Sequence, residues 1–259
     1  MWNEQLSETL ETWYATPDGA FALSRKRELF RRLASGWPRR GRKLLQIGCG
    51  SGMFLGMLWE DGFDVTGFDS SPELLRSAAK RLDNRAEFRL GQPDHLPFDD
   101  DEFDYAVIPT AFEFLPAPEA ALAEALRVAA RGVVAMFVNR FSLFRLRGKS
   151  NEPPFYLRKG LSPWAVYAMS KRLCPSGRLT LRTIIPCPVC LWKEAQLLRR
   201  VNSLPLILPV GAFAGICIDK KPGIPMTPLW LTTRKLKPQE EPCGTAMQSL
   251  QHGQSSSFR

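Results

Sequence analysis

The stretch Lys43-Leu-Leu-Gln-Ile-Gly-Cys-Gly-Ser-Gly52 is an apolar run that passes directly into three glycines at alternate positions. Glycine lets a backbone turn sharply and approach a ligand closely, because no Cβ stands in the way. A second apolar run, Phe63-Asp-Val-Thr-Gly-Phe68, ends at Asp69, 17 residues beyond Gly52. The two runs predict parallel strands, with the glycine turn and Asp69 both at the carboxyl edge of their sheet.

An acidic residue at the tip of the second strand suits the two hydroxyls of a ribose, so these features predict a site for an adenosine-type cofactor. The spacing of the glycines indicates which cofactor-binding motif this is. The dinucleotide fingerprint needs G-x-G-x-x-G, but here the third glycine comes one residue early and Met53 takes its place. A P-loop needs a lysine after its last glycine, and none follows Gly52.

The run from Lys43 to Gly52 resembles motif I of the class I S-adenosylmethionine (SAM)-dependent methyltransferases. Gly91-Gln-Pro-Asp-His-Leu-Pro-Phe98, followed by Phe103-Asp104, is similar to the G-D-A-x-x-L-P-F…F-D stretch of their type 11 (ubiquinone/menaquinone-type) subgroup. The resemblance implies methyl transfer with SAM as cofactor. It also implies the cofactor-binding residues: Gln46, Gly48, Gly50 and Gly52 at the methionine part, Asp69 at the ribose, Gln92 and Pro93 at the adenine, and Ile108 and Tyr14 beside them.

Three positions depart from the family pattern. Gln46 and Gln92 stand where relatives usually carry a carboxylate, near the methionine ammonium and at the adenine. An amide oxygen still accepts a hydrogen bond, but a charged acceptor roughly doubles the strength of that bond. We therefore expect weaker SAM binding unless nearby carboxylates compensate. Glu113 stands where relatives commonly have histidine, and it is the candidate for acceptor contact or general base, with a solvated carboxylate as the alternative.

Strand-like and helix-like segments alternate over the first 138 residues. The patterns predict strands at residues 43–47, 63–68, 86–90, 103–109 and 133–138, and helices at 3–35 (broken by a turn at 16–19), 52–60, 72–82 and 118–131. A helix from 162 to 174 and strands at 178–185 and 212–218 follow. This α/β alternation predicts a Rossmann-like, mainly parallel seven-stranded sheet with helices on both faces, and the resemblance adds an antiparallel last strand.

We expect four parts along the chain. Residues 1–40 form an N-terminal helical lid, 41–138 the SAM-binding core, 139–221 a substrate-cap connection with the C-terminal strands of the same domain, and 222–259 a disordered tail rich in Pro, Lys, Ser and Gln. The segment from Trp13 to Gly19 resembles the lid that many family members fold over SAM. Tyr14 could cover the sulfonium, because aromatic faces attract cations, or it could simply pack.

The charge is unevenly distributed. Residues 1–138 hold 16 Lys/Arg and 21 Asp/Glu, whereas residues 139–259 hold 19 Lys/Arg and 5 Asp/Glu. A basic half suits an anionic partner, with an ordinary solvated surface as the alternative. The segment 140–149, which interleaves basic and apolar residues, fits an acidic substrate, a nucleic-acid backbone or an anionic membrane surface.

The start of the chain has no signal-like pattern and no apolar run reaches membrane-spanning length, so we expect a cytoplasmic protein. Cys187 and Cys190 form a C-x-x-C pair without a second such pair, and we expect no metal site. The sequence predicts a SAM-dependent methyltransferase with a small-molecule acceptor. It leaves open an RNA, protein or membrane-quinone acceptor, and a SAM-binding regulator without turnover.

Overall fold

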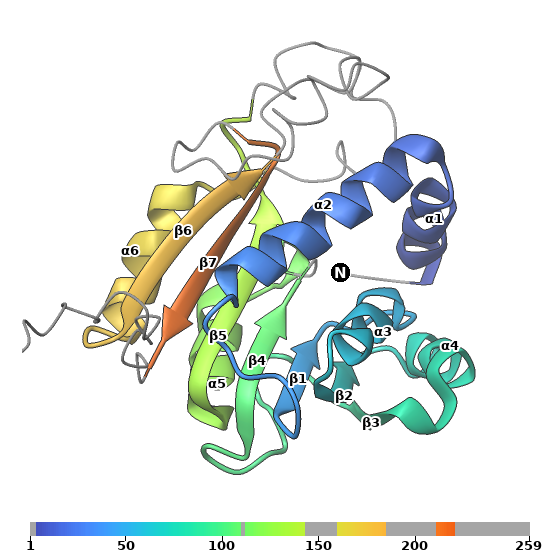
Figure 1. Ribbon diagram of the computed structural model, residues 1–259, viewed down its shortest axis with the longest axis horizontal. Helices are drawn as coiled ribbons and strands as arrows, with labels where there is room; N and C mark the ends of the chain where they lie inside the picture. Colours follow the sequence, from blue (N-terminus) through green and yellow to red (C-terminus); the bar gives the residue numbers. More distant parts are fainter. Residues whose placement is uncertain (1–3, 110–111, 143–159, 185–210, 221–259) are drawn as a thin grey trace, which may run out of the picture. The chain divides into compact units, whose positions relative to one another are not determined.

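The computed structural model describes residues 4–109, 112–142, 160–184 and 211–220, all within one compact unit, Met1–Gly223. Its centre is a seven-stranded sheet of β1 (Lys43–Ile47), β2 (Asp64–Asp69), β3 (Ala86–Leu90), β4 (Phe103–Ile108), β5 (Ala129–Val138), β6 (Arg178–Ile184) and β7 (Phe213–Asp219). The strand order is β3-β2-β1-β4-β5-β7-β6 (Figure 1). Strands β1 to β5 pair in parallel, and β7 is antiparallel to both β5 and β6. The predicted fold class is confirmed.

Helices cover both faces of this sheet. One face packs against α1 (Glu4–Tyr14), α2 (Pro17–Leu33), α3 (Met53–Glu60) and α4 (Pro72–Leu82), and the other against α5 (Pro118–Val128) and α6 (Pro163–Leu173). Side chains alternate along the strands, as a sheet buried on both faces requires. Leu44 packs in the core under α2 and α3, whereas its neighbour Leu45 packs in the core under α5.

The helix predicted over residues 118–131 is shorter than expected. It ends at Val128, and β5 begins at Ala129, which pairs with Phe103 of β4. The Lys220 Nζ donates to the carbonyl oxygens of Leu126 at 3.0 Å and Ala129 at 2.8 Å. Strand pairing and this lysine contact at the helix end therefore override the helix propensity of the alanine-rich sequence.

The turn predicted at residues 16–19 belongs mostly to α2. Thr16 is the N-cap, and its Oγ1 accepts a hydrogen bond from the Gly19 N–H at 3.1 Å. Pro17 occupies the first helical position, where its missing N–H costs nothing. Only residues 15 and 16 therefore separate α1 from α2, and the two helices make a tight pair.

No helix within the described parts of the chain combines the length and apolar character needed to span a bilayer. The boundaries at residues 40, 138 and 221 stay predictions. The tail 222–259 and the pair Cys187 and Cys190 lie outside the described residues.

Candidate active site

The loop of residues 48–52 joins β1 to α3 at the carboxyl edge of the sheet. Gly48, Gly50 and Gly52 have φ angles of 70°, 55° and 80°, in the left-handed region that favours glycine. At Gly52 a Cβ would also lie 3.2 Å from the Cα of Ala78 in α4. The three glycines therefore serve one tight turn that brings backbone N–H groups to the edge of the sheet.

Asp69 ends β2 beside this loop and is 4% exposed. Its Oδ2 accepts a hydrogen bond from the Gly50 N–H at 2.8 Å, and its Oδ1 accepts one from the Ser71 N–H at 3.0 Å. Burial raises the pKa of the Asp69 carboxyl, and hydrogen bonds from the backbone of Gly50, Ser71 and Ser70 partly offset that rise. A carboxylate can accept about four hydrogen bonds, so Asp69 retains acceptor capacity for ribose hydroxyls.

Gln46 lies on β1 between Gly67 of β2 and Val107 of β4. Its side chain is 1% exposed, and its Oε1 has no hydrogen-bond partner among the described residues. A buried acceptor without a partner is costly, so the Gln46 Oε1 is a candidate to accept a hydrogen bond from a ligand at the glycine loop. An ammonium group such as that of the SAM methionine fits this acceptor.

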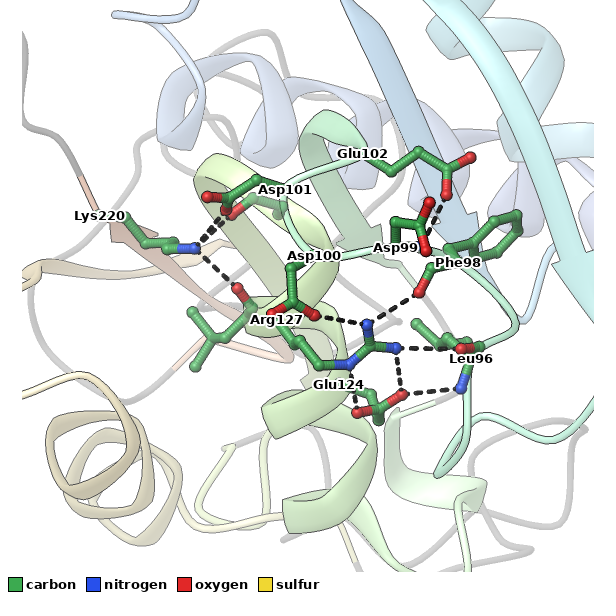
Figure 2. A network of polar contacts seen from close by, with 11 residues as sticks. Leu96, Phe98, Asp99, Asp100, Asp101, Glu102, Glu124, Arg127 and Lys220 are labelled. Carbon is green, nitrogen blue, oxygen red and sulfur yellow. Dashed lines mark hydrogen bonds and ion pairs between the residues drawn. The ribbon is translucent and has the colours of Figure 1, made fainter.

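The loop of residues 91–102 carries the predicted adenine contacts, Gln92 and Pro93, and a network of polar contacts fastens it to α5 (Figure 2). Arg127 of α5 donates to the carbonyl oxygens of Leu96 at 3.0 Å and Phe98 at 2.8 Å. It also pairs with Glu124 at 2.8 Å and with Asp100 at 2.9 Å. Glu124 Oε2 in turn accepts a hydrogen bond from the Leu96 N–H at 2.8 Å.

This network shifts the pKa values of two α5 side chains, Glu124 and Arg127. The hydrogen bond from Arg127 lowers the pKa of the Glu124 carboxyl, and the two carboxylates Glu124 and Asp100 raise the pKa of the Arg127 guanidinium. Glu124 and Arg127 were not among the site residues predicted from the sequence. Their i, i+3 spacing indicates a pair on one helix face, but nothing in the sequence indicates their contact with the distant loop of residues 91–102.

Tyr14 and Lys26 meet above the sheet. Tyr14 ends α1, and its hydroxyl oxygen accepts a hydrogen bond from the Lys26 Nζ at 3.1 Å. Lys26 is 4% exposed on the buried face of α2, although it stands between two arginines in the sequence. Sequence reasoning missed Lys26. The 3–4 residue spacing of the buried positions on α2, which includes residues 19, 22, 23, 26, 29, 30 and 33, could have found it.

Two further residues predicted to form the site lie at the end of β4 and in the segment after it. Ile108 ends that strand, and its side chain is fully buried in the core under α5. A contact between Ile108 and a ligand would therefore involve its backbone. Glu113 lies in the 3-10 helix η2 (Phe112–Phe114), and its catalytic role stays a prediction.

Comparisons with known proteins agree with this geometry. Residues 45–137 match the family model described as "Methyltransferase domain". A demethylmenaquinone methyltransferase of Clavibacter sepedonicus is 34% identical over 93 residues, which are 35% of this chain and 38% of that protein. A malonyl-[acyl-carrier protein] O-methyltransferase of Serratia marcescens is 34% identical over 107 residues, 41% of this chain and 42% of that protein. The matched segments thus span less than half of these relatives.

Among solved structures, a SAM-dependent methyltransferase of Thermotoga maritima, described as a possible histamine N-methyltransferase, has a TM-score of 0.63 at 21% sequence identity. The alignment covers 84% of this chain and 98% of that one, so the shared fold extends well beyond the segment matched by the family model. Residues 45–137 therefore match the methyltransferase domain model, within a chain that has the fold of the class I SAM-dependent methyltransferases.

Proposed function

We propose that this protein transfers a methyl group from SAM to a small-molecule acceptor. The observation that carries the proposal is the pairing of the 48–52 turn with the buried carboxylate of Asp69 at the carboxyl edge of the sheet. The reaction class is supported by the two curated relatives described above, since both are methyltransferases.

Each part of SAM has a proposed set of binding residues. The 48–52 turn and the unpartnered Gln46 Oε1 would hold the methionine, Asp69 the ribose, and the fastened 91–102 loop the adenine. When bound, SAM supplies a methyl group on a positively charged sulfur, which an acceptor displaces in line. The protein contributes orientation and exclusion of water, and needs a base only if the acceptor must lose a proton. Glu113 is the proposed base for such acceptors.

Isothermal titration with S-adenosylhomocysteine (SAH) tests the donor site. We expect micromolar binding by the wild-type protein, and a loss of at least tenfold in Asp69→Ala, because a charge-assisted contact contributes roughly 1.5–3 kcal/mol. Arg76→Ala, on the exposed side of α4, provides the control and leaves SAH affinity unchanged. An Asp69→Ala variant with wild-type affinity contradicts the proposal.

A second candidate is a SAM-binding protein without turnover, favoured by the neutral Gln46 at a buried position where relatives usually carry a carboxylate. Methyl transfer to a panel of acids, amines and phenols, followed with methyl-labelled SAM, separates the two candidates. One methylated acceptor eliminates the second candidate. Binding of SAM without any methylation across the panel eliminates the first.

A further inference from the structure

Lys26 is a buried cation with an unusual set of neighbours. Its Nζ donates to the Tyr14 hydroxyl at 3.1 Å and lies 4.6 Å from the centre of the Phe213 ring and 5.8 Å from that of Tyr14. Among the residues that the structure describes, no carboxylate lies within ion-pair distance of this ammonium. Its contacts are therefore a neutral hydroxyl and two aromatic faces.

Such an environment compensates an ammonium only in part. Lysine is almost never fully buried unless it is paired, because removing a charge from water costs more than a neutral hydrogen bond returns. Aromatic faces attract cations, but more weakly than an anion does at contact distance in a region of low dielectric. The described part of the chain thus holds a positive charge that is complementary to an anion, and its own residues do not supply one.

The position of Lys26 indicates which ligand would bring that anion. Phe213 opens β7 and pairs with Val138 at the carboxyl end of β5. In the order β1-β4-β5-β7, this strand is three places from β1, roughly 14 Å at about 4.8 Å per strand. Lys26 therefore lies toward the β5–β7 half of the ligand-binding edge, away from the 48–52 turn that would hold the donor.

Tyr14 connects this ammonium to the donor half. It ends α1, and Glu11 of that helix pairs with Arg81 of α4 at 3.2 Å. The Arg81 Nε also donates to the Ser51 carbonyl oxygen in the glycine turn at 3.0 Å. The Lys26–Tyr14 pair thus occupies the space between the donor turn and the first residues of β7, where an acceptor would approach a bound methyl group.

We propose that Lys26 and Tyr14 bind an anionic oxygen group, a carboxylate or phosphate, of the methyl acceptor. The inference rests on the proposed function, and it specifies the acceptor as an acid. It assigns Lys26 to recognition of that group through its ammonium, with the Tyr14 hydroxyl orienting the ammonium. The methionine carboxylate of the donor is the competing source of the same chemistry.

Stability of the ligand-free protein gives the first test. Lys26→Met keeps the length of the side chain and removes the charge, so we expect the melting temperature to rise by about 2–4 °C, the shift typical of a modest stabilisation in a chain of this size. A lysine that serves only packing would give a lower melting temperature when replaced. A fall therefore overturns the proposal.

Binding gives the second test, with SAH present at saturation. The probes are benzoate and its neutral analogue benzamide, titrated by ligand-observed NMR. We expect the wild-type protein to bind benzoate at least tenfold more tightly than benzamide. Lys26→Met should abolish that preference, Lys26→Arg should retain most of it, and Lys80→Met, a matched change at an exposed position of α4, should leave it intact.

Titrations of SAH and of 5′-methylthioadenosine, which lacks the amino acid part, separate the outcomes. If Lys26→Met weakens SAH at least tenfold but not methylthioadenosine, Lys26 binds the donor carboxylate and the proposal is wrong. Unchanged SAH affinity with loss of the benzoate preference supports it. Equal binding of benzoate and benzamide by a wild-type protein that binds SAH overturns it while the proposed function stands. A wild-type protein that binds no SAH overturns the proposed function itself.

Discussion

The buried carboxyl group of Asp69, the proposed ribose contact, is expected to cost stability in the free protein. It is buried at the end of β2, and burial raises its pKa despite hydrogen bonds from the backbone of Gly50 and Ser71. At neutral pH the folded chain therefore carries a charge in a place that disfavours it. Hydroxyl donors from a bound ribose would stabilise that charge, so binding and stability are coupled at this one residue.

The pH dependence of stability tests this account of Asp69. An unfolded aspartate titrates near pH 3.9, and the folded group titrates higher, so between the two values the folded protein binds more protons than the unfolded chain. The contribution of Asp69 to stability therefore falls as the pH rises through that window. We expect the stability of Asp69→Asn relative to wild type to increase between pH 4 and pH 7 in urea unfolding. A relative stability that stays constant or declines contradicts the assignment.

How much of the site the sequence predicts depends on whether the signal is local. Gly48, Gly50 and Gly52 form the tight turn that their spacing predicted, and the structure adds their positive φ angles. A tight turn is predictable because its glycines lie close together in the sequence. No local sequence pattern of this kind identifies Lys26 as a buried residue. In the sequence it is one of three consecutive basic residues, typical of a solvated face, and only the packing of α2 on the sheet shows that it is buried.

At the scale of elements, the close contact between α1 and α2 depends on Gly19. A Cβ at this position would lie 1.9 Å from the Trp13 carbonyl oxygen and 2.8 Å from the Tyr14 Cα. Helix propensity alone would favour alanine by about 1 kcal/mol. Because of this clash, alanine would destabilise the protein despite its helix propensity. α1 would have to move away from α2, and Tyr14 would move with it.

Gly19→Ala is therefore expected to destabilise the protein by about 1–3 kcal/mol, the usual cost of overpacking. It should also remove the preference for benzoate over benzamide, because the Tyr14 hydroxyl would leave the Lys26 ammonium. Gly36→Ala is the matched control, since a Cβ there meets no atom within 4 Å. Chemical unfolding and the NMR titration measure both effects. Equal behaviour of the two variants would show that the packing of α1 on α2 does not depend on Gly19.

The connection between α5 and the 91–102 loop gives a second element-scale prediction. Arg127→Met leaves the carbonyl oxygens of Leu96 and Phe98 without their donor, so we expect a loss of about 1–3 kcal/mol and weaker SAH binding. Hydrogen exchange of the loop amides should accelerate. Arg131→Met, which removes a more exposed pairing with Asp104, should cost at most about 1 kcal/mol and leave SAH affinity unchanged. Unchanged loop exchange in Arg127→Met would count against this role.

The elements themselves were predictable to different degrees. The strands over residues 43–47 and 86–90 have the predicted limits, and β2 and β4 differ from their predictions by one residue at one or both ends. β5 begins four residues earlier than predicted, at Ala129. The helix from Pro118 was predicted to end three residues too late, because the alanine-rich segment after Val128 favours helix locally. What ends it is the pairing of Ala129 with β4, together with Lys220, a residue 91 positions along the chain.

At the scale of the whole molecule, the proposed donor site and Lys26 lie on different halves of one edge of the sheet. The carboxyl ends of β1, β2 and β4 surround the proposed donor site, and the start of β7 lies beside Lys26. The alternation of strands and helices predicted the parallel part of this sheet. The resemblance added only that the last strand is antiparallel. The position of β7 between β5 and β6 was not predicted, because a chain that crosses from one strand to another leaves no periodic signal.

The opposite edge of the sheet carries a contact that should affect stability without affecting ligands. Trp37, beyond the end of α2, stacks on Tyr105 of β4 at 4.0 Å, and its Nε1 donates to Asp219 Oδ1 of β7 at 2.8 Å. Asp219 pairs in register with Gly132 near the start of β5, which places this contact far from the glycine turn. Trp37 thus joins β4 and β7 to the segment that links the lid to β1.

Trp37→Phe keeps an aromatic ring over Tyr105 but removes the indole N–H and part of the ring volume. We expect a loss of about 1–3 kcal/mol in unfolding free energy, hence a lower melting temperature, with unchanged affinity for SAH and an unchanged benzoate preference. Trp59→Phe, at a residue that is 42% exposed, is the control and should change neither quantity. Lys26→Met is expected to show the reverse pattern, a higher melting temperature with lost acid recognition. If the two variants instead changed stability and binding in the same direction, the two edges of the sheet would not have the separate roles inferred from their contacts.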